Sequence, residues 1–281
     1  MSGRTEQRFA DRVNVVIENH VAEVCLDRPD KRNALDGAMF SGIAQAGEFV
    51  KTAPGVRAVV LYGNGASFCA GLDFSSFQAM AGGDGAGASN SNDEPVSALT
   101  ENGLTHRGQQ VAYVWEEVPV PVIAAVHGHA LGGGIQIALG ADIRIVHPAT
   151  QMSVREVFWG LVPDMSGTLT LARLVREDVA RELTYTARVF PGSEAAELGL
   201  ATRLSEDPLA EARAMAAMIA GNSPDAVRGA KELFHRRVLA DAKDQLALER
   251  TVIGRLIGSP NQVEAVMSGM AKRPGDYADP S

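Results

Sequence analysis

Three consecutive glycines, Gly132 to Gly134, constrain most strongly what this chain can fold into. They follow an apolar run, Val122 to Val126, that predicts a buried strand, and they lead into Gly134 to Leu139, which predicts a buried helix. Because glycine costs backbone entropy on folding, such a run suits a place where no Cβ fits. A strand-to-helix turn also points unpaired N–H groups at a negatively charged atom. The alternative is a tight turn that serves only helix–strand packing.

A second glycine-rich turn follows another predicted strand. Residues 57–62 predict that strand, and the segment GNGASFCAGLD at 63–73 continues from it. Phe68 occupies the third glycine position of G-x-G-x-x-G, and no G-K-[ST] follows either glycine cluster. Neither turn therefore has a nucleotide-binding fingerprint. Two glycine turns that each offer a backbone N–H are what an oxyanion hole requires.

Four motifs in this chain resemble those of the crotonase (enoyl-CoA hydratase/isomerase) superfamily. They are LDRPDKRNAL at 26–35, FCAGLD at 68–73, AVHGHALGGG at 125–134, and the segment with GLVP at 160–163 and SGTL at 166–169. The resemblance covers nearly the whole chain. It implies an α/β fold, a crotonase-like ββα superhelix, with a C-terminal helical oligomerisation unit that assembles homotrimers or homohexamers.

Gly, Pro and Asn residues indicate how the chain is divided. Strands are expected over 14–19 and 21–26, joined as a hairpin, and an amphipathic helix over 35–52. We expect a ββα spiral core over 1–205 and a helical domain over 206–281, with helices at 207–220, 223–239, 241–257 and 261–272. Residues 81–95, rich in Gly, Ser and Asn, predict a mobile loop, either a cap over an acyl tail or a solvated insertion without a role.

Composition limits the partners and the compartment. With 281 residues, 46% of them hydrophobic, the chain can bury a large core. A net charge of −8 argues against a nucleic-acid partner. No apolar run approaches the roughly 20 residues that span a bilayer, and residues 1–11 lack the apolar segment of a signal peptide. Because Cys25 and Cys69 are the only cysteines, no disulfide framework is expected, and a cytoplasmic location is simplest.

The resemblance implies an acyl-CoA thioester as substrate and an enolate as intermediate. The backbone N–H groups of Leu72 and Gly133 would bind the enolate oxygen, and each preorganised donor stabilises such a transition state by roughly 3–4 kcal/mol. Coenzyme A belongs to the substrate, so no separate cofactor or metal is expected. The candidate substrate-binding residues are Arg28, Lys31, Ala70, Asp73 and Gln136. Arg28 and Lys31 would hold coenzyme A phosphates, and the alternative for each is a solvated surface role.

Acidic side chains select the reaction. A family hydratase uses two glutamates: Glu156 matches the second, but Gln136 at the first position cannot transfer a proton. In the dienoyl-CoA isomerase branch, a glutamate and an aspartate occupy the positions of Glu156 and Asp164, where they accept a proton at C2 and donate one at C6. That branch has an aspartate where this chain has Gln136. The structural alternatives are an ion pair of Glu156 with Arg155 or Arg144, and Asp164 as the cap of a helix that begins at Ser166.

Two further groups favour structural roles. His127 and His129 form an H-x-H pair, but the flanking glycines and the lack of a third ligand argue against a metal site. Cys69 is best interpreted as small buried filler.

Two function classes stay open. One is an enzyme that isomerises 3,5-dienoyl- to 2,4-dienoyl-CoA or 3-enoyl- to 2-enoyl-CoA, or that hydrates 2-enoyl-CoA. The other is an acyl-CoA binding protein with little catalysis. Because Asp164 restores a second proton-transfer group, isomerisation is favoured.

Overall fold

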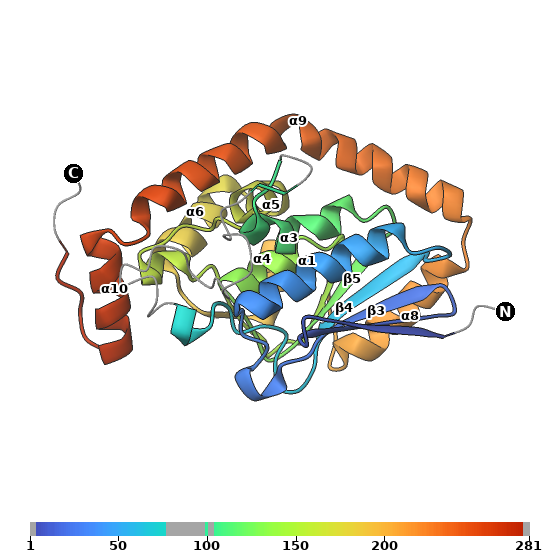
Figure 1. Cartoon of the computed structure of the whole chain (residues 1–281), viewed down its shortest axis with the longest axis horizontal. Coiled ribbons are helices and arrows are strands. Elements are labelled where there is room, and N and C mark those ends of the chain that lie inside the picture. Colours follow the sequence, from blue (N-terminus) through green and yellow to red (C-terminus); the bar gives the residue numbers. More distant parts are fainter. Residues whose placement is uncertain (1–3, 77–98, 101–103, 278–281) are drawn as a thin grey trace.

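Two sheets organise the part of the chain described in the computed structural model, which covers residues 4–76, 99–100 and 104–277 (Figure 1). The larger sheet has the order β1-β2-β3-β4-β5-β7-β10 and comprises β1 (Thr5–Phe9), β2 (Val13–Glu18), β3 (Val21–Leu26), β4 (Ala58–Gly63), β5 (Val122–Val126), β7 (Ile143–Val146) and β10 (Arg203–Leu204). The first three strands pair antiparallel, and every pairing from β3 onward is parallel. The smaller sheet comprises β6 (His129–Leu131), β8 (Gln151–Ser153) and β9 (Phe190–Pro191).

Helices connect and cover these strands. They are η1 (Pro29–Lys31), α1 (Gly37–Thr52), α3 (Arg107–Glu117), α4 (Gly133–Leu139), η2 (Glu156–Trp159), α5 (Gly167–Leu174), α6 (Glu177–Thr186), α7 (Gly192–Leu198), α8 (Pro208–Ala220), α9 (Pro224–Leu256) and α10 (Pro260–Ala271). The predicted mixed α/β fold is confirmed, and the predicted strands and first helix agree with β2 to β5 and α1 to within two residues. The segment 81–95, predicted as a loop, lies outside the described residues.

Both faces of the central strands are buried, which explains their continuous apolar sequences. Alternate residues of β4 and β5, such as Val59 and Ala124, belong to one core with α1 and α3, whereas Val60 and Ile123 join Ala212 of α8 on the other face. Figure 1 shows α1 and α3 on one side of the sheet and α8 on the opposite side. The sheet is thus held between two helical layers.

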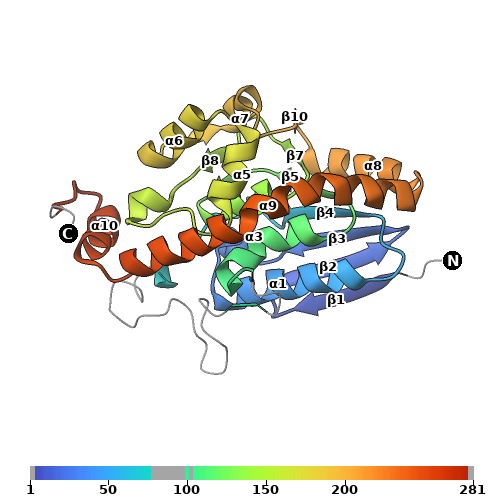
Figure 2. The same cartoon turned by 90° about the horizontal axis from the view of Figure 1, so that it is seen from above.

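The C-terminal part contains fewer helices than the sequence indicated. The two helices expected over 223–239 and 241–257 are one 33-residue helix, α9, so the predicted break at Ala240 is wrong. The segment Leu239-Ala240-Asp241 contains no glycine or proline, and alanine has the highest helix propensity. Figure 2 shows α9 crossing over α3. Its Lys231 fixes this position by donating to Trp115 O and Val120 O, each at 3.0 Å, and to Asp142 Oδ2 at 2.7 Å.

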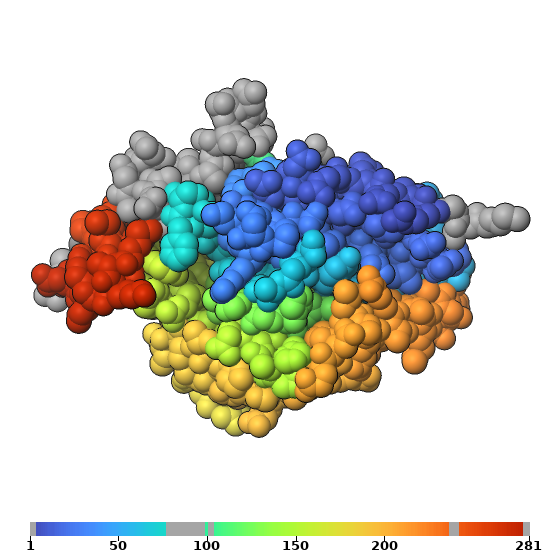
Figure 3. All heavy atoms as spheres, turned by 90° about the horizontal axis from the view of Figure 1, so that it is seen from below, coloured from blue at the N-terminus to red at the C-terminus, as the bar shows by residue number. Residues whose placement is uncertain are grey.

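The last helix lies at one end of the molecule, where Figure 3 shows α10 in red. It packs on η2, because Gly160 and Gly269 leave room for Gln262 and Trp159 respectively. α9 leaves Leu233, Phe234 and Leu248 exposed. Assembly as a homotrimer or homohexamer and the domain boundary after residue 205 stay predictions. Among the described helices, none combines the length and apolar character that crossing a bilayer requires.

Asn33 connects the first motif to the second. Its side chain is fully buried, with Nδ2 at 3.0, 2.8 and 3.2 Å from the carbonyl oxygens of Asn64, Ser67 and Phe68. Its Oδ1 accepts from Arg28 N at 2.8 Å. The φ of +56° is in the left-handed region, which asparagine tolerates better than most residues. One amide therefore holds the glycine-rich turn that follows β4.

Removing this amide should destabilise the fold. Asn33→Ala leaves several buried carbonyl groups without a donor, so the free energy of unfolding should fall by roughly 2–4 kcal/mol. Chemical denaturation followed by circular dichroism measures this difference. The control is Asn14→Ala, which removes only a bond from Asn14 Nδ2 to Glu6 Oε1 and should change stability by less than about 0.5 kcal/mol. Equal effects of the two substitutions would contradict the assigned role of Asn33.

Candidate active site

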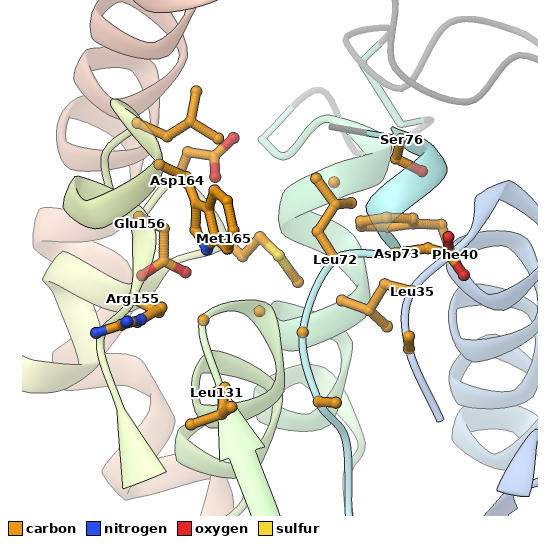
Figure 4. A pocket seen from close by; sticks show the side chains of 18 of the residues that line it. Leu35, Phe40, Leu72, Asp73, Ser76, Leu131, Arg155, Glu156, Asp164 and Met165 are labelled. Carbon is orange, nitrogen blue, oxygen red and sulfur yellow. The ribbon is translucent and has the colours of Figure 1, made fainter. Parts of the chain in front are cut away.

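A cavity of about 890 Å³ lies where the glycine-rich turns after β4 and β6 meet α9. Its lining includes Asp30–Arg32, Ala70–Phe74, Leu131–Gly133, Arg155, Glu156, Asp164 and, from α9 and its C-cap residue, Arg250, Ile253, Gly254 and Ile257. In Figure 4, Glu156, Asp164 and Met165 lie on one side of this cavity and face Leu72 and Leu35 on the other. The described structure therefore brings together four of the predicted catalytic groups: Leu72, Gly133, Glu156 and Asp164.

Two backbone N–H groups are left free to face a ligand. Leu35 N donates to Gly71 O at 2.8 Å and Asp73 N to Leu35 O at 3.0 Å. Because neighbouring peptide groups of an extended chain alternate in direction, the N–H of Leu72 points away from Leu35. Gly133 is the first residue of α4, where an N–H has no intrahelical acceptor. Neither N–H donates to any acceptor in the described part of the chain.

Glycine is required where these turns approach one another. Gly132 has φ 52° and ψ −120°, a conformation essentially restricted to glycine. Gly71 has φ +88°, and a Cβ there would lie 2.6 Å from Leu131 O. A Cβ on Gly133 would lie 2.6 Å from Leu35 Cδ1. The run of glycines thus serves close packing as well as the exposure of N–H groups.

An ion pair steadies the strand that carries Leu72. Arg28 Nη1 donates to Asp73 Oδ2 at 2.6 Å and to Ala34 O at 3.1 Å, and Arg28 Nη2 lies 3.5 Å from Asp36 Oδ2. Arg28 does not line the cavity, so its position does not favour the predicted contact with coenzyme A. Asp73 lines the cavity, but its carboxylate is taken by Arg28 and by the N–H and hydroxyl of Ser75.

Glu156 is buried at the start of η2. Its Oε1 accepts from Gln136 Nε2 at 2.6 Å, and its Oε2 meets no donor among the described residues. Neither alternative ion pair is formed: Arg155 Nη1 donates to Ala187 O, and Arg144 donates to Leu200 O and Ala141 O. One oxygen is therefore fixed by an amide while the other is unpaired.

Gln136 lies behind Glu156 and does not line the cavity. Its Oε1 accepts from Met165 N and Gly167 N, each at 2.9 Å, while Nε2 donates to Glu156. This placement does not favour the predicted contact with substrate. Gln136 instead connects α4, Glu156 and the turn that carries Asp164.

Asp164 is partly buried and faces the cavity from the turn before α5. Its proposed capping role is filled by other side chains. Met165 N and Gly167 N donate to Gln136, whereas Ser166 N and Thr168 N donate to Glu249. The carboxyl of Asp164 is thus not needed to cap the helix.

Burial raises the pKa of both acids. It raises the pKa of Glu156 to about 7, against which the hydrogen bond from Gln136 acts. For Asp164, burial first and then the negative charges of Glu249 and Glu156 raise the pKa to about 8. The rise is larger for Asp164, which has two negative neighbours, than for Glu156, which accepts a hydrogen bond from Gln136. Two carboxyl groups whose pKa values are raised to different extents suit the roles of one base and one acid.

Cationic and polar groups occupy another part of the lining. Lys31, one of the two predicted phosphate contacts, lines the cavity together with Arg32 and the predicted Ala70. Arg32 Nη1 lies 3.4 Å from His129 Nε2, and His129 Nδ1 lies 2.9 Å from Ser67 Oγ. Since a guanidinium only donates, Nε2 is the acceptor and Nδ1 carries the proton. Burial and then Arg32 lower the pKa of His129, which keeps it neutral.

The two histidines of the H-x-H pair have different partners, and Cys69 is buried. His127 Nε2 contacts Gly65 O at 2.9 Å, away from His129. No group of three His, Cys, Asp or Glu side chains in the described ranges could hold a metal. Burial raises the pKa of Cys69 to about 12, so its thiol stays unreactive.

Sequence reasoning missed Arg32, Arg155 and Glu249. Arg32 lies inside the first motif, between Pro29 and Asn33, at a position where the motif allows any residue. Glu249 occupies the apolar stripe of α9 formed by Ala242, Leu246 and Ile253, and an acid on such a stripe is itself a signal of a buried polar contact. No comparable signal marks Arg155.

Removal of the Asp164 carboxyl should stabilise the protein as pH rises. An ordinary aspartate has a pKa of about 3.9, and folding raises the Asp164 pKa to about 8. Between these values the unfolded chain has lost the proton that the folded chain retains, so the stability contributed by the protonated form falls as pH increases. Asp164→Asn has no carboxyl to ionise and so avoids this loss. At pH 8 its free energy of unfolding, measured by chemical denaturation, should be roughly 1–3 kcal/mol higher than that of the unmodified protein.

The matched control for this series is Asp178→Asn. Asp178 is exposed, and the hydrogen bond from Arg176 lowers its pKa, so its stability difference should stay constant between pH 5 and 9. A constant difference for Asp164→Asn as well would contradict the raised pKa of Asp164.

Comparison with known proteins agrees with this geometry. The family model described as enoyl-CoA hydratase/isomerase matches residues 16–280. A probable enoyl-CoA hydratase of Bacillus subtilis (strain 168) is 30% identical over 264 residues, covering 93% of this chain and 96% of that protein. The mitochondrial Delta(3,5)-Delta(2,4)-dienoyl-CoA isomerase of Mus musculus is 32% identical over 222 residues, covering 76% and 65% respectively.

Solved structures share the fold of this chain. An enoyl-CoA hydratase/isomerase from Pseudoalteromonas atlantica T6c superposes with a TM-score of 0.81 at 25% identity, over 95% of this chain and 99% of that one. Hydratase names predominate among the related sequences. The motifs, the cavity and the family match together place this chain in the enoyl-CoA hydratase/isomerase family, the crotonase superfamily.

Proposed function

We propose that this protein is a double-bond isomerase of unsaturated acyl-CoA thioesters, most specifically of 3,5-dienoyl-CoA. The observation that carries the proposal is the pair Glu156 and Asp164, two cavity-lining carboxyl groups with differently raised pKa values. They line the same cavity as Leu72 and Gly133, whose N–H groups donate to no acceptor among the described residues. A 1,5-proton shift needs one base, one acid and a site for negative charge between them.

Glu156 would begin the reaction as the base. Its unpaired Oε2 takes a proton from C2, the C2–H electron pair moves into the conjugated system, and negative charge gathers on the thioester oxygen. The N–H groups of Leu72 and Gly133 bind that oxygen. The bond from Gln136 to Oε1 holds the carboxylate in place and favours its ionised form.

Asp164 would complete the reaction as the acid. It delivers its proton to C6, so the double bonds at C3 and C5 become double bonds at C2 and C4. Glu156 then holds a proton and Asp164 a charge, and exchange with solvent restores the starting state. Protons alone move, so the proposed reaction requires no redox cofactor.

Hydration of 2-enoyl-CoA is the second candidate, favoured by the names of the related sequences. A family hydratase holds its water between two carboxylates. Here the first of those positions carries Gln136, whose amide is taken by Met165 N, Gly167 N and Glu156. With that amide engaged behind the cavity wall, Glu156 is the one carboxyl left at the two positions that a family hydratase uses to hold its water.

Removal of the base should abolish turnover. Purified protein is offered 3,5-dienoyl-, 3-enoyl- and 2-enoyl-CoA, and the ultraviolet spectrum reports the conjugated product. Glu156→Gln should lower kcat for the 3,5-dienoyl substrate by roughly 10²–10⁴-fold and leave the dissociation constant for acyl-CoA nearly unchanged. Full turnover by this variant with every substrate would contradict the role of Glu156. Binding by the unmodified protein without turnover would identify an acyl-CoA binding protein instead.

The pH profile and Asp164→Asn separate isomerase from hydratase. With Glu156 as base and Asp164 as acid, kcat/KM for isomerisation should rise through about pH 7 and fall through about pH 8. Asp164→Asn should abolish isomerisation of 3,5-dienoyl-CoA because an amide cannot protonate C6. Robust hydration of 2-enoyl-CoA by the unmodified protein that survives Asp164→Asn would overturn the isomerase proposal.

A further inference from the structure

Glu249 is a third buried carboxyl beside the active site. It lies on α9, its side chain is 3% exposed, and it does not itself line the cavity. No Lys, Arg or His in the described part of the chain forms an ion pair with it. A buried carboxyl without a cation is costly unless several donors satisfy it. The groups that donate hydrogen bonds to Glu249 therefore indicate which segment it holds in position.

Three of the four donors belong to the segment that follows Asp164. Ser166 N donates to Glu249 Oε2 at 3.0 Å, Thr168 N to Oε1 at 3.3 Å and Thr168 Oγ1 to Oε1 at 2.6 Å. The fourth is Gln109 Nε2 of α3, at 3.1 Å from Oε2. A carboxylate from a distant helix thus supplies the N-terminal cap of α5, a place where negative charge is favoured.

Gln136 and Glu249 hold this segment from two sides. Gln136 takes the N–H groups of Met165 and Gly167, and Glu249 takes those of Ser166 and Thr168. We propose that Glu249 is a positioning residue for the proton donor: it fixes the turn that presents Asp164 and supplies the negative charge against which Asp164 retains its proton. The inference rests on the proposed function, in which Asp164 is the acid.

No nearby cation in the described part of the chain pairs with Glu249, so its negative charge acts on Asp164 without compensation. Arg250, the next residue, directs Nη1 to Leu104 O and Gln109 Oε1 instead. On α3, burial lowers the pKa of His106 to about 4, so it is neutral above pH 5. The charge of Glu249 raises the pKa of both Asp164 and Glu156, and for Asp164 only burial has a larger effect.

Glu249 also joins the C-terminal helix to the chemistry. The same helix contributes the adjacent Arg250 to the cavity wall, together with Ile253 and Gly254 about one turn further on. A displacement of α9 would move the wall and the anchor of the Asp164 turn together. The acid is therefore positioned by the C-terminal part of the chain as well as by the spiral core.

The test is the pH dependence of kcat in Glu249→Gln, measured with 3,5-dienoyl-CoA. Loss of the charge lowers the pKa of Asp164, so the alkaline limb should move to lower pH by roughly 0.5–1.5 units, with a smaller movement of the acid limb. Thr168→Val is the matched control, since it removes the 2.6 Å contact but retains the charge. It should lower kcat without moving either limb. A limb that stays in place in Glu249→Gln, or moves equally in both variants, overturns the proposal.

A second variant changes the charge in the opposite direction. Gln245 lies one turn before Glu249 and donates to Thr168 Oγ1 at 2.5 Å. Gln245→Glu adds a carboxylate to the same contact and should move the alkaline limb to higher pH. This variant decides the question if Glu249→Gln does not fold, and an unmoved limb then overturns the proposal.

A measurement without substrate separates this inference from the proposed function. If the unmodified protein does not isomerise 3,5-dienoyl-CoA, the proposed function fails. The stability gap between the unmodified protein and Asp164→Asn still reports the proton on Asp164. That gap at pH 8 should shrink when Glu249→Gln is present in both members of the pair. An unchanged gap would overturn the role of Glu249 alone.

Discussion

The close crossing of two glycine turns is the constraint on which the rest of the site depends. Cys69 N donates to His129 O and Leu131 N to Cys69 O, so the segments after β4 and β5 run side by side. A Cβ on Gly71 or Gly134 would collide with a carbonyl of the other segment at 2.6 or 2.3 Å. Only this proximity puts the N–H groups of Leu72 and Gly133 beside one cavity. The glycines therefore fix where an anion can be held before any side chain takes part.

The polar residues of the motifs serve this crossing more than they serve a ligand. Asn33 holds the first turn through three carbonyl groups, and Arg28 holds the strand of Leu72 through Asp73. Gln136 does the same for the acids, because one amide bonds both Glu156 and the backbone beside Asp164. These motif residues therefore mainly hold other groups in position. The groups that face the cavity are two backbone N–H groups and two carboxyl groups.

The sequence predicted local structure well where a periodic pattern or a glycine turn decided it. β3 and β5 match their predicted bounds, and Glu156 and Asp164 lie at the cavity as their motif positions indicated. The predicted break at Ala240 was wrong because no local sequence pattern indicates whether two helical segments continue as one helix. Arg28 could not be separated from Lys31 by spacing, because Arg28 is partly buried beside Asp73, which lies 45 positions further along the chain. Glu249 is 85 positions from Asp164 and was missed for the same reason.

The energetic character of the site follows from burying acids without cations. Burial alone raises the pKa of Glu156, Asp164 and Glu249, and each carboxyl makes the ionisation of its neighbours harder. Hydrogen-bond donors oppose this rise to different extents: Glu249 has four donors, Glu156 has one on Oε1, and Asp164 has none of the α5 N–H groups. Three similar groups thus differ in the number of donors that favour their ionised forms. A base and an acid can differ in this way without any difference in their intrinsic chemistry.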